Sequence, residues 1–165
     1  MRLSNLIITT SFVALLSSMS LNAQAAEGGA IKVKSVAQVE MELMKEGKKT
    51  LVRQPVEKAV PGTEIIFTNT FENVSGKTAS DIVINNPIPD STTYKAGSAF
   101  GTDCEIIFSV DEGKTFGVPE TLKVLGADNK ERTALPGEYT NIRWTYKKPL
   151  AAGKAGEVGF RAAIN

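Results

Sequence analysis

Alternation is complete in the stretch Ile142-Arg143-Trp144-Thr145-Tyr146-Lys147, where an apolar or aromatic residue stands at every second position. A period of two with β-branched and aromatic residues is typical of a β-strand that buries one face. The same period predicts strands at residues 39–43, 65–71, 82–84, 106–108 and 158–164, and further strands are expected at residues 50–60 and 122–125. Helical spacing is almost absent, so the sequence predicts an all-β fold.

Turn residues separate these alternating stretches, as in Glu46-Gly47-Lys48 and Leu135-Pro136-Gly137. Pro87 and Pro89 should end a strand, because proline has no N–H to donate to a neighbouring strand. Strands that follow one another without helical spacers favour an antiparallel sandwich over βαβ units. We therefore predict an immunoglobulin-like antiparallel β-sandwich of about seven to nine strands, and a barrel is the alternative.

The first residues look like a secretory signal peptide. A positive start at Arg2 precedes an apolar stretch at residues 6–21, and Ala23-Gln24-Ala25 supplies small residues for cleavage after Ala25. The apolar stretch is shorter than the roughly 20 residues that a spanning helix needs, and we expect no membrane span once the signal is removed. We predict a signal peptide at residues 1–25, a flexible lead at 26–30 and a single β-sandwich domain at 31–165.

Composition excludes several kinds of catalysis. The chain of 165 residues has no histidine and one cysteine, Cys104, so a Ser-His-Asp triad, a Cys-His pair and an internal disulfide are impossible. Zinc usually needs several His or Cys ligands. Removal of Arg2 with the signal peptide would leave 18 basic and 18 acidic residues, and a neutral chain has little attraction for nucleic acid. We predict a non-enzymatic protein without a cofactor and without a nucleic-acid partner.

Two spaced stretches carry a family resemblance. Residues 64–70 end in Thr68-Asn69-Thr70, residues 79–89 end in Asn85-Asn86-Pro87-Ile88-Pro89, and Tyr94 and Gly97-Ser98 follow. Together with a last turn and strand at residues 149–160, this pattern resembles the bacterial conserved-repeat domain known as domain of unknown function eleven. The resemblance implies an immunoglobulin-like sandwich of surface or secreted proteins, without catalytic residues. The motif residues would be structural: Asn69, Pro87, Pro89, Tyr94, Gly97 and Ser98. The chain has one copy, and Asn86-Pro87 stands where the family usually has an aspartate.

A second resemblance marks one hairpin. Residues 109–116 fit the pattern S-x-D-x-G-x-T-(W/F) and resemble the Asp box of sialidase-type propellers and other secreted β proteins. An aspartate in such a turn accepts backbone N–H groups and a glycine supplies positive φ, and we expect the aromatic residue to fold into the core. The predicted hairpin residues are Ser109, Asp111, Gly113, Thr115 and Phe116. A single copy does not indicate a sialidase.

Nearby acids leave a weak calcium site open, although their spacing is not that of an EF-hand loop. The four carboxylates are Asp103, Glu105, Asp111 and Glu112. We predict no metal site.

These features predict an exported structural or protein-interaction module of a bacterial envelope or surface, periplasmic or secreted. Its partner, an unidentified envelope or surface protein, would be recognised through shape and strand edges. One alternative is a secreted carbohydrate- or ligand-binding protein that uses the aromatic face of Trp144 and Tyr146, which requires Trp144 to be exposed. Another is a subunit of an envelope assembly, linked through Cys104 as an intermolecular thiol.

Overall fold

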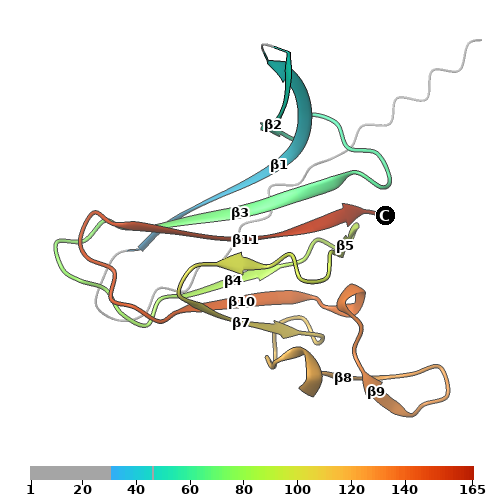
Figure 1. Cartoon of the computed structure of the whole chain (residues 1–165). Coiled ribbons are helices and arrows are strands. Elements are labelled where there is room, and N and C mark those ends of the chain that lie inside the picture. Colours follow the sequence, from blue (N-terminus) through green and yellow to red (C-terminus); the bar gives the residue numbers. More distant parts are fainter. Residues whose placement is uncertain (1–30, 46) are drawn as a thin grey trace, which may run out of the picture.

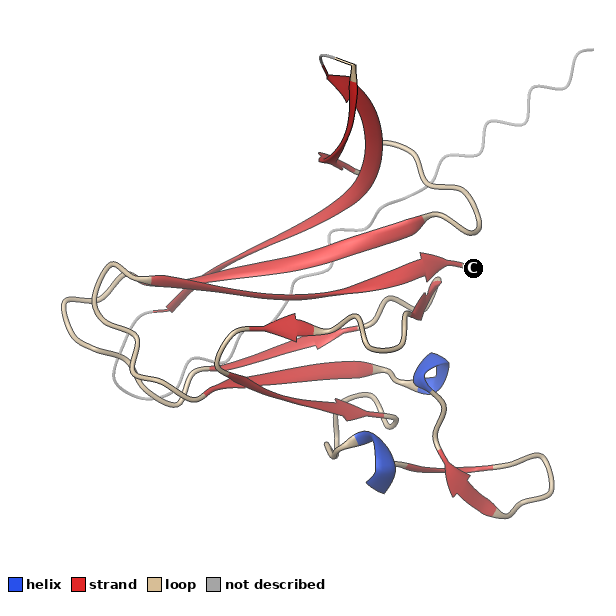
Figure 2. Ribbon diagram, viewed as in Figure 1, coloured by secondary structure: helices blue, strands red, loops and turns tan. Residues whose placement is uncertain are grey.

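The computed structural model describes residues 31–45 and 47–165, and they form an antiparallel β-sandwich (Figures 1 and 2). The predicted signal peptide, its cleavage point after Ala25 and the flexible lead at residues 26–30 lie outside the described residues. A six-stranded sheet faces a three-stranded sheet, and a small two-stranded sheet lies beside the latter. The predicted all-β class is confirmed.

The larger sheet has the strand order β2-β1-β3-β11-β5, with the short β6 also paired to β11. All of its pairings are antiparallel. Its strands are β1 (Ile31–Lys45), β2 (Lys48–Pro55), β3 (Glu64–Asn73), β5 (Thr92–Tyr94), β6 (Phe100–Gly101) and β11 (Ala155–Ile164). The last strand along the chain therefore lies in the middle of this sheet.

The smaller sheets complete the fold. The three-stranded sheet has the order β4-β10-β7, formed by β4 (Val83–Pro87), β10 (Asn141–Tyr146) and β7 (Cys104–Ser109). The two-stranded sheet pairs β8 (Lys123–Leu125) with β9 (Glu131–Thr133). Two single 3₁₀ turns flank it, η1 (Pro119–Thr121) and η2 (Pro136–Glu138). In the part of the chain that the structure describes, no helix has the length and apolar character to cross a membrane.

Aromatic rings fill the space between the two large sheets. Trp144 on β10 and Phe160 on β11 are fully buried, and their ring centroids are 6.3 Å apart. Phe67 on β3 stacks on Phe160 at 5.0 Å. Stacked and tilted aromatic pairs contribute beyond the area they bury. The alternation in residues 142–147 thus places Ile142 and Trp144 in the core, as a half-buried strand requires.

Strand β1 is longer than the part of it that pairs with its neighbour β3. Its first half, residues 31–38, pairs with β3, and its second half, from Gln38 to Lys45, pairs with β2. Gln38 is the position at which the pairing changes from β3 to β2. The β1–β2 hairpin consequently bends away from the two sheets and projects from the body (Figure 1).

The structure differs from the sequence prediction in three details. Residues 31–45 and 47–165 form eleven strands instead of about seven to nine, because β5, β6 and β9 are too short for a periodic pattern to reveal, whereas β8 falls within the strand predicted at residues 122–125. Strand β2 ends at Pro55, five residues before the predicted end, since a proline cannot continue the ladder. Both faces of β3 are buried, the inner face at Ile65, Asn69 and Phe71 and the outer face at Ile66 and Thr68; the Phe100 ring lies on the outer face at Gly159, the residue paired with Thr68.

Gly159 is a site where one methyl group should destabilise the protein. A Cβ at this position would lie 2.4 Å from the Phe67 carbonyl oxygen and 2.6 Å from the Phe100 ring. We expect Gly159→Ala to lower the free energy of unfolding by about 1–3 kcal/mol, as overpacking does, measured by urea denaturation. Gly76→Ala is the control: nothing lies within 4 Å of its added Cβ, and its effect should stay within about 0.5 kcal/mol. Equal effects of the two substitutions would contradict this packing.

Candidate interaction site

The projecting β1–β2 hairpin exposes an unusual amount of apolar surface. Met41, Leu43 and Met44 on β1 and Leu51 on β2 are 46%, 42%, 68% and 64% exposed. The pairing of directly opposite residues places Met41 and Leu43 on one face of the hairpin and Met44 and Leu51 on the other. In the described part of the chain no other element covers either face, because the second sheet ends beneath the body of the first (Figure 1).

The outer edge of β2 has backbone groups that no strand uses. The Val56 N–H donates to the Ala37 carbonyl at 3.3 Å, which makes Ala37 and Val56 a hydrogen-bonded pair. Hydrogen-bonded and non-bonded pairs alternate in an antiparallel ladder, and the register then turns the backbone groups of Lys49, Leu51 and Arg53 away from β1. Within residues 31–45 and 47–165, strand β2 pairs only with β1, so these three residues present an edge that no described strand uses.

An ion-pair cluster holds the base of the hairpin to the body. The Arg161 guanidinium on β11 donates to both Glu40 oxygens, at 2.8 and 2.9 Å, and to Glu64 at 2.8 Å. These hydrogen bonds are the main cause of the lowered pKa of Glu40. Arg53 adds a contact from its Nε to Glu40 at 3.2 Å. Because the Arg161 and Glu40 side chains are only about a quarter exposed, we expect this pair to stabilise the hairpin more than a fully solvated pair would.

The other strand edges of the two main sheets are shorter or obstructed. Strand β4 ends at Pro87, and Pro89 follows two residues later; prolines at an edge discourage further pairing. Strand β5 has three residues. Strand β7 is bridged on its other side, where Phe108 and Gly117 exchange backbone hydrogen bonds. Among these edges, β2 is the longest that remains open.

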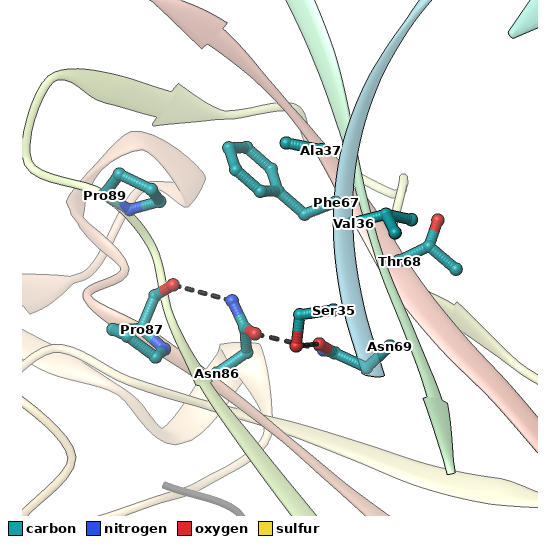
Figure 3. Close-up of a pocket in the computed structure, with 9 residues that line it drawn as sticks. All are labelled: Ser35, Val36, Ala37, Phe67, Thr68, Asn69, Asn86, Pro87 and Pro89. Carbon is teal, nitrogen blue, oxygen red and sulfur yellow. Dashed lines mark hydrogen bonds between the residues drawn. The ribbon is translucent and has the colours of Figure 1, made fainter. Parts of the chain in front are cut away.

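A groove of about 250 Å³ lies between the base of β1, β3 and the end of β4 (Figure 3). Ala37, Phe67 and Pro89 form its apolar wall. Three of its polar side chains bond in series: the Ser35 hydroxyl donates to Asn69, Asn69 donates to Asn86, and Asn86 donates to the Pro87 carbonyl, at 2.6, 3.0 and 2.8 Å. The buried Thr68 hydroxyl, which also lines the groove, has no hydrogen-bond partner among the described residues, but it is a single group. The groove offers a polar ligand no convergent free donors, and we do not assign it one.

The remaining residues of the first resemblance lie at the far edge of the larger sheet. The Tyr94 hydroxyl accepts the Ala99 N–H at 3.1 Å, and Gly97 has a φ of 71° in the turn between them. The Ser98 hydroxyl donates to the Lys95 carbonyl and accepts the Arg161 N–H. These contacts shape a turn, and the motif is split between this turn and the groove.

The Asp-box residues form a compact turn after β7. Asp111 accepts the Thr115 hydroxyl, the Thr115 N–H and the Ser109 hydroxyl, and these bonds, with the Thr115 hydroxyl first, hold the pKa of Asp111 far below its usual range. Gly113 has a φ of 82°. Phe116 does not enter the core as expected; it is half-buried beneath the Arg143 guanidinium, which lies 3.7 Å from its ring centroid.

Trp144 is 0% exposed, which removes it from any surface platform. Tyr146, two residues later on β10, is half-buried and contacts Phe71 edge-on. The aromatic face predicted from alternation therefore points mainly into the core.

Cys104 is half-buried at the start of β7. Burial, and next the charge of Asp103, raise the pKa of its thiol. A raised pKa lowers the fraction of thiolate, which is the reactive form.

The four acids considered for calcium do not converge. Asp103 pairs with Lys148 and Glu105 with Lys147, while Asp111 is occupied within its own turn. No group of three or more acidic or cysteine side chains in residues 31–45 and 47–165 is placed to hold a metal ion.

Sequence patterns did not identify the β1–β2 hairpin as a candidate interaction site. Its alternation at residues 39–43 was correctly assigned to a strand, but alternation predicts a buried face that here remains exposed. One signal was present: the hairpin carries apolar residues on both faces, Met41 and Leu43 on one and Met44 and Leu51 on the other. A strand with one solvated face usually alternates cleanly.

Comparison with known proteins adds no relative. No protein-family model matches the chain, and a search of curated proteins found no similar sequence.

The ion-pair cluster predicts where flexibility will appear when it is removed. We expect Arg161→Met to speed amide hydrogen exchange about fivefold in residues 39–45 and 48–55, the effect of losing roughly 1 kcal/mol of local stability. Arg132→Met is the matched control, because Arg132 makes a two-pronged pair with Glu138 far from the hairpin. Faster exchange throughout the sandwich, or no change in the hairpin, would show that Arg161 does not fix the hairpin.

The raised pKa of Cys104 predicts that its thiol reacts slowly. At pH 7.5, an aromatic disulfide reagent should label the folded chain several times more slowly than the chain in denaturant. Electrophoresis without reductant should show a monomer. Rapid labelling together with a disulfide-linked dimer would favour the linked-subunit alternative.

Proposed function

We propose that this chain is an exported, non-enzymatic protein-interaction module of a bacterial envelope or surface, periplasmic or secreted, that pairs an extended segment of a partner protein with the free edge of β2. The observation that carries the proposal is the open edge itself, with the backbone groups of Lys49, Leu51 and Arg53 turned away from β1. Export is supported by the signal-peptide pattern that ends at Ala25.

Strand addition suits this edge for two physical reasons. Unpaired N–H and C=O groups on an edge strand are a template for another chain, and main-chain hydrogen bonds supply the affinity of such complexes. Exposed side chains on both faces of the hairpin then supply apolar area, at Met41 and Leu43 on one side and Leu51 on the other. Ion pairs to Arg161 hold this edge in place before a partner arrives, which lowers the ordering cost of binding.

A second candidate, carbohydrate binding, has one observation in its favour. A polar hollow of about 560 Å³ is lined by Tyr146 and Phe100 together with the carboxylates Asp103 and Glu157. Aromatic rings with a few polar groups are typical of small-molecule sites. It remains second because Trp144 is buried and Asp103 is already paired with Lys148.

The substitution Leu51→Pro tests strand addition. It removes an N–H that points away from β1, and proline is tolerated at such edge positions, so the fold should persist while partner binding is lost. Leu51→Thr is the matched control, because it shortens the side chain but keeps the N–H. Affinity purification from an envelope fraction, with mass spectrometry, should identify proteins retained by the wild type and by Leu51→Thr but lost with Leu51→Pro.

Unfolding curves first establish that Leu51→Pro is folded. Retention of the same proteins by Leu51→Pro would contradict strand addition at β2. Tight binding on a glycan array that is abolished by Tyr146→Ala, with no protein retained, would replace the proposal with the carbohydrate alternative.

A further inference from the structure

We propose that the partner segment that pairs with β2 is acidic. It has one carboxylate residue on each side of an apolar residue, in the pattern acid-x-apolar-x-acid. This inference rests on the proposed function and adds the chemistry of the partner. Two observations support the inference: the positive charges along β2, and the ion pairs that the acids of β1 already make with them.

Strand β2 is cationic along its whole length. Its eight residues include Lys48, Lys49 and Arg53 and no acid. Lys49, Leu51 and Arg53 alternate on one face, so a strand added beside β2 would place its own residues i, i+2 and i+4 next to a cation, an apolar side chain and a second cation. Opposite charges on facing strands stabilise the pair, and like charges destabilise it.

Both cations on this face keep capacity for another carboxylate. Arg53 contacts Glu40 through Nε alone, and its two terminal nitrogens make no hydrogen bond with the described residues. Lys49 uses one contact, to Glu42 at 2.9 Å, and its side chain is 73% exposed. A second carboxylate can therefore reach each cation from the open side of β2.

Strand β1 shows how this edge is satisfied from its other side. Arg53 faces Glu40 across the β1–β2 ladder, and Lys49 reaches diagonally to Glu42. Between them lies the largest exposed apolar side chain of β2, Leu51, at 64% exposure. A partner segment that sets one acid beside Arg53, one acid beside Lys49 and an apolar residue over Leu51 would complete a three-stranded arrangement.

A second copy of this chain is a poorer occupant. In the two-fold antiparallel register that sets Leu51 opposite itself, each Lys49 would face the other copy's Arg53, and facing like charges are destabilising. Lysine on an edge strand is a common protection against self-pairing. The cations that discourage a second copy attract an acidic strand, so one feature supplies both selection and affinity.

The side chains on the other face of β2 indicate a weaker preference, for the residue type at the intervening positions of the partner segment. Thr50 and Val52 lie there, opposite Leu43 and Met41 of β1. Beta-branched residues pack well against one another across strands. We therefore place threonine or valine at the intervening positions of the segment.

Two capped peptides test the charge pattern directly. The first is Thr-Glu-Thr-Val-Thr-Glu-Thr and the second replaces both Glu residues with Lys, each with blocked ends and a fluorescent label. Fluorescence anisotropy with the full mature chain should show at least tenfold tighter binding of the Glu peptide, a difference of about 1.4 kcal/mol. Binding should weaken as salt rises, because these charges are exposed.

A variant with reversed charges on β2 tests whether these two residues set the preference between the peptides. The double variant Lys49→Glu/Arg53→Glu should bind the Lys peptide in preference to the Glu peptide. Lys114→Glu/Lys130→Glu changes the net charge equally at exposed positions remote from the hairpin and should keep the wild-type preference. Since Lys49 and Arg53 also pair with β1, unfolding curves and the retained binding of the Lys peptide show that the variant is folded.

The outcomes separate this inference from the proposed function. Equal binding of both peptides that is lost with Leu51→Pro would overturn the acidic pattern and leave strand addition standing. Binding of the Glu peptide that survives Leu51→Pro would contradict both. Failure of the Glu peptide to bind at millimolar concentration would overturn the acidic pattern. So would a dimer in analytical ultracentrifugation that Leu51→Pro abolishes, because the occupant would then be a second copy.

Discussion

The exposed β1–β2 hairpin depends on one constraint, which is that β1 is longer than its pairing with β3. Strand β1 has 15 residues, and only residues 31–38 pair with β3. The rest of the strand lies beyond its pairing with β3, and among the described residues it pairs with β2 alone. The other features of the hairpin accompany this geometry: it lies beyond the core, its apolar residues are exposed, and no described strand pairs with its outer edge.

In the proposed function, the sandwich supplies stability and the hairpin supplies recognition. The stacked rings of Phe67, Phe160 and Trp144 lie in the body, and neither sheet needs the hairpin to bury them. Arg161 joins the two parts, because it lies on a central strand and binds Glu40 at the base of the hairpin. In the proposed function, this arrangement would hold the β2 edge in place without involving apolar core residues, and functional surfaces are commonly carried this way on a rigid scaffold.

Sequence periodicity predicted the fold class well and the site poorly. Alternation located the buried strands at Ile142 and Phe160, where one face meets the core and period and burial agree. It assigned a strand to residues 39–43 but could not show that this half of β1 leaves the sheet, because pairing partners distant along the chain decide that. The alternation that set Trp144 on the face expected to be buried agrees with its burial, and the alternative of an exposed aromatic face could be decided only by packing between the sheets.

Hydrogen exchange on the complex is the most direct measurement of the central claim that the free edge of β2 receives a strand. The mature chain, bound to the partner identified from the envelope fraction, should show strong new protection at the amides of Lys49, Leu51 and Arg53. Neighbouring amides of β2 that already bond to β1 should change less, since alternate residues face opposite edges. Protection confined to the hollow beside Tyr146 or to the groove beside Pro89, with these three amides unchanged, would contradict the account.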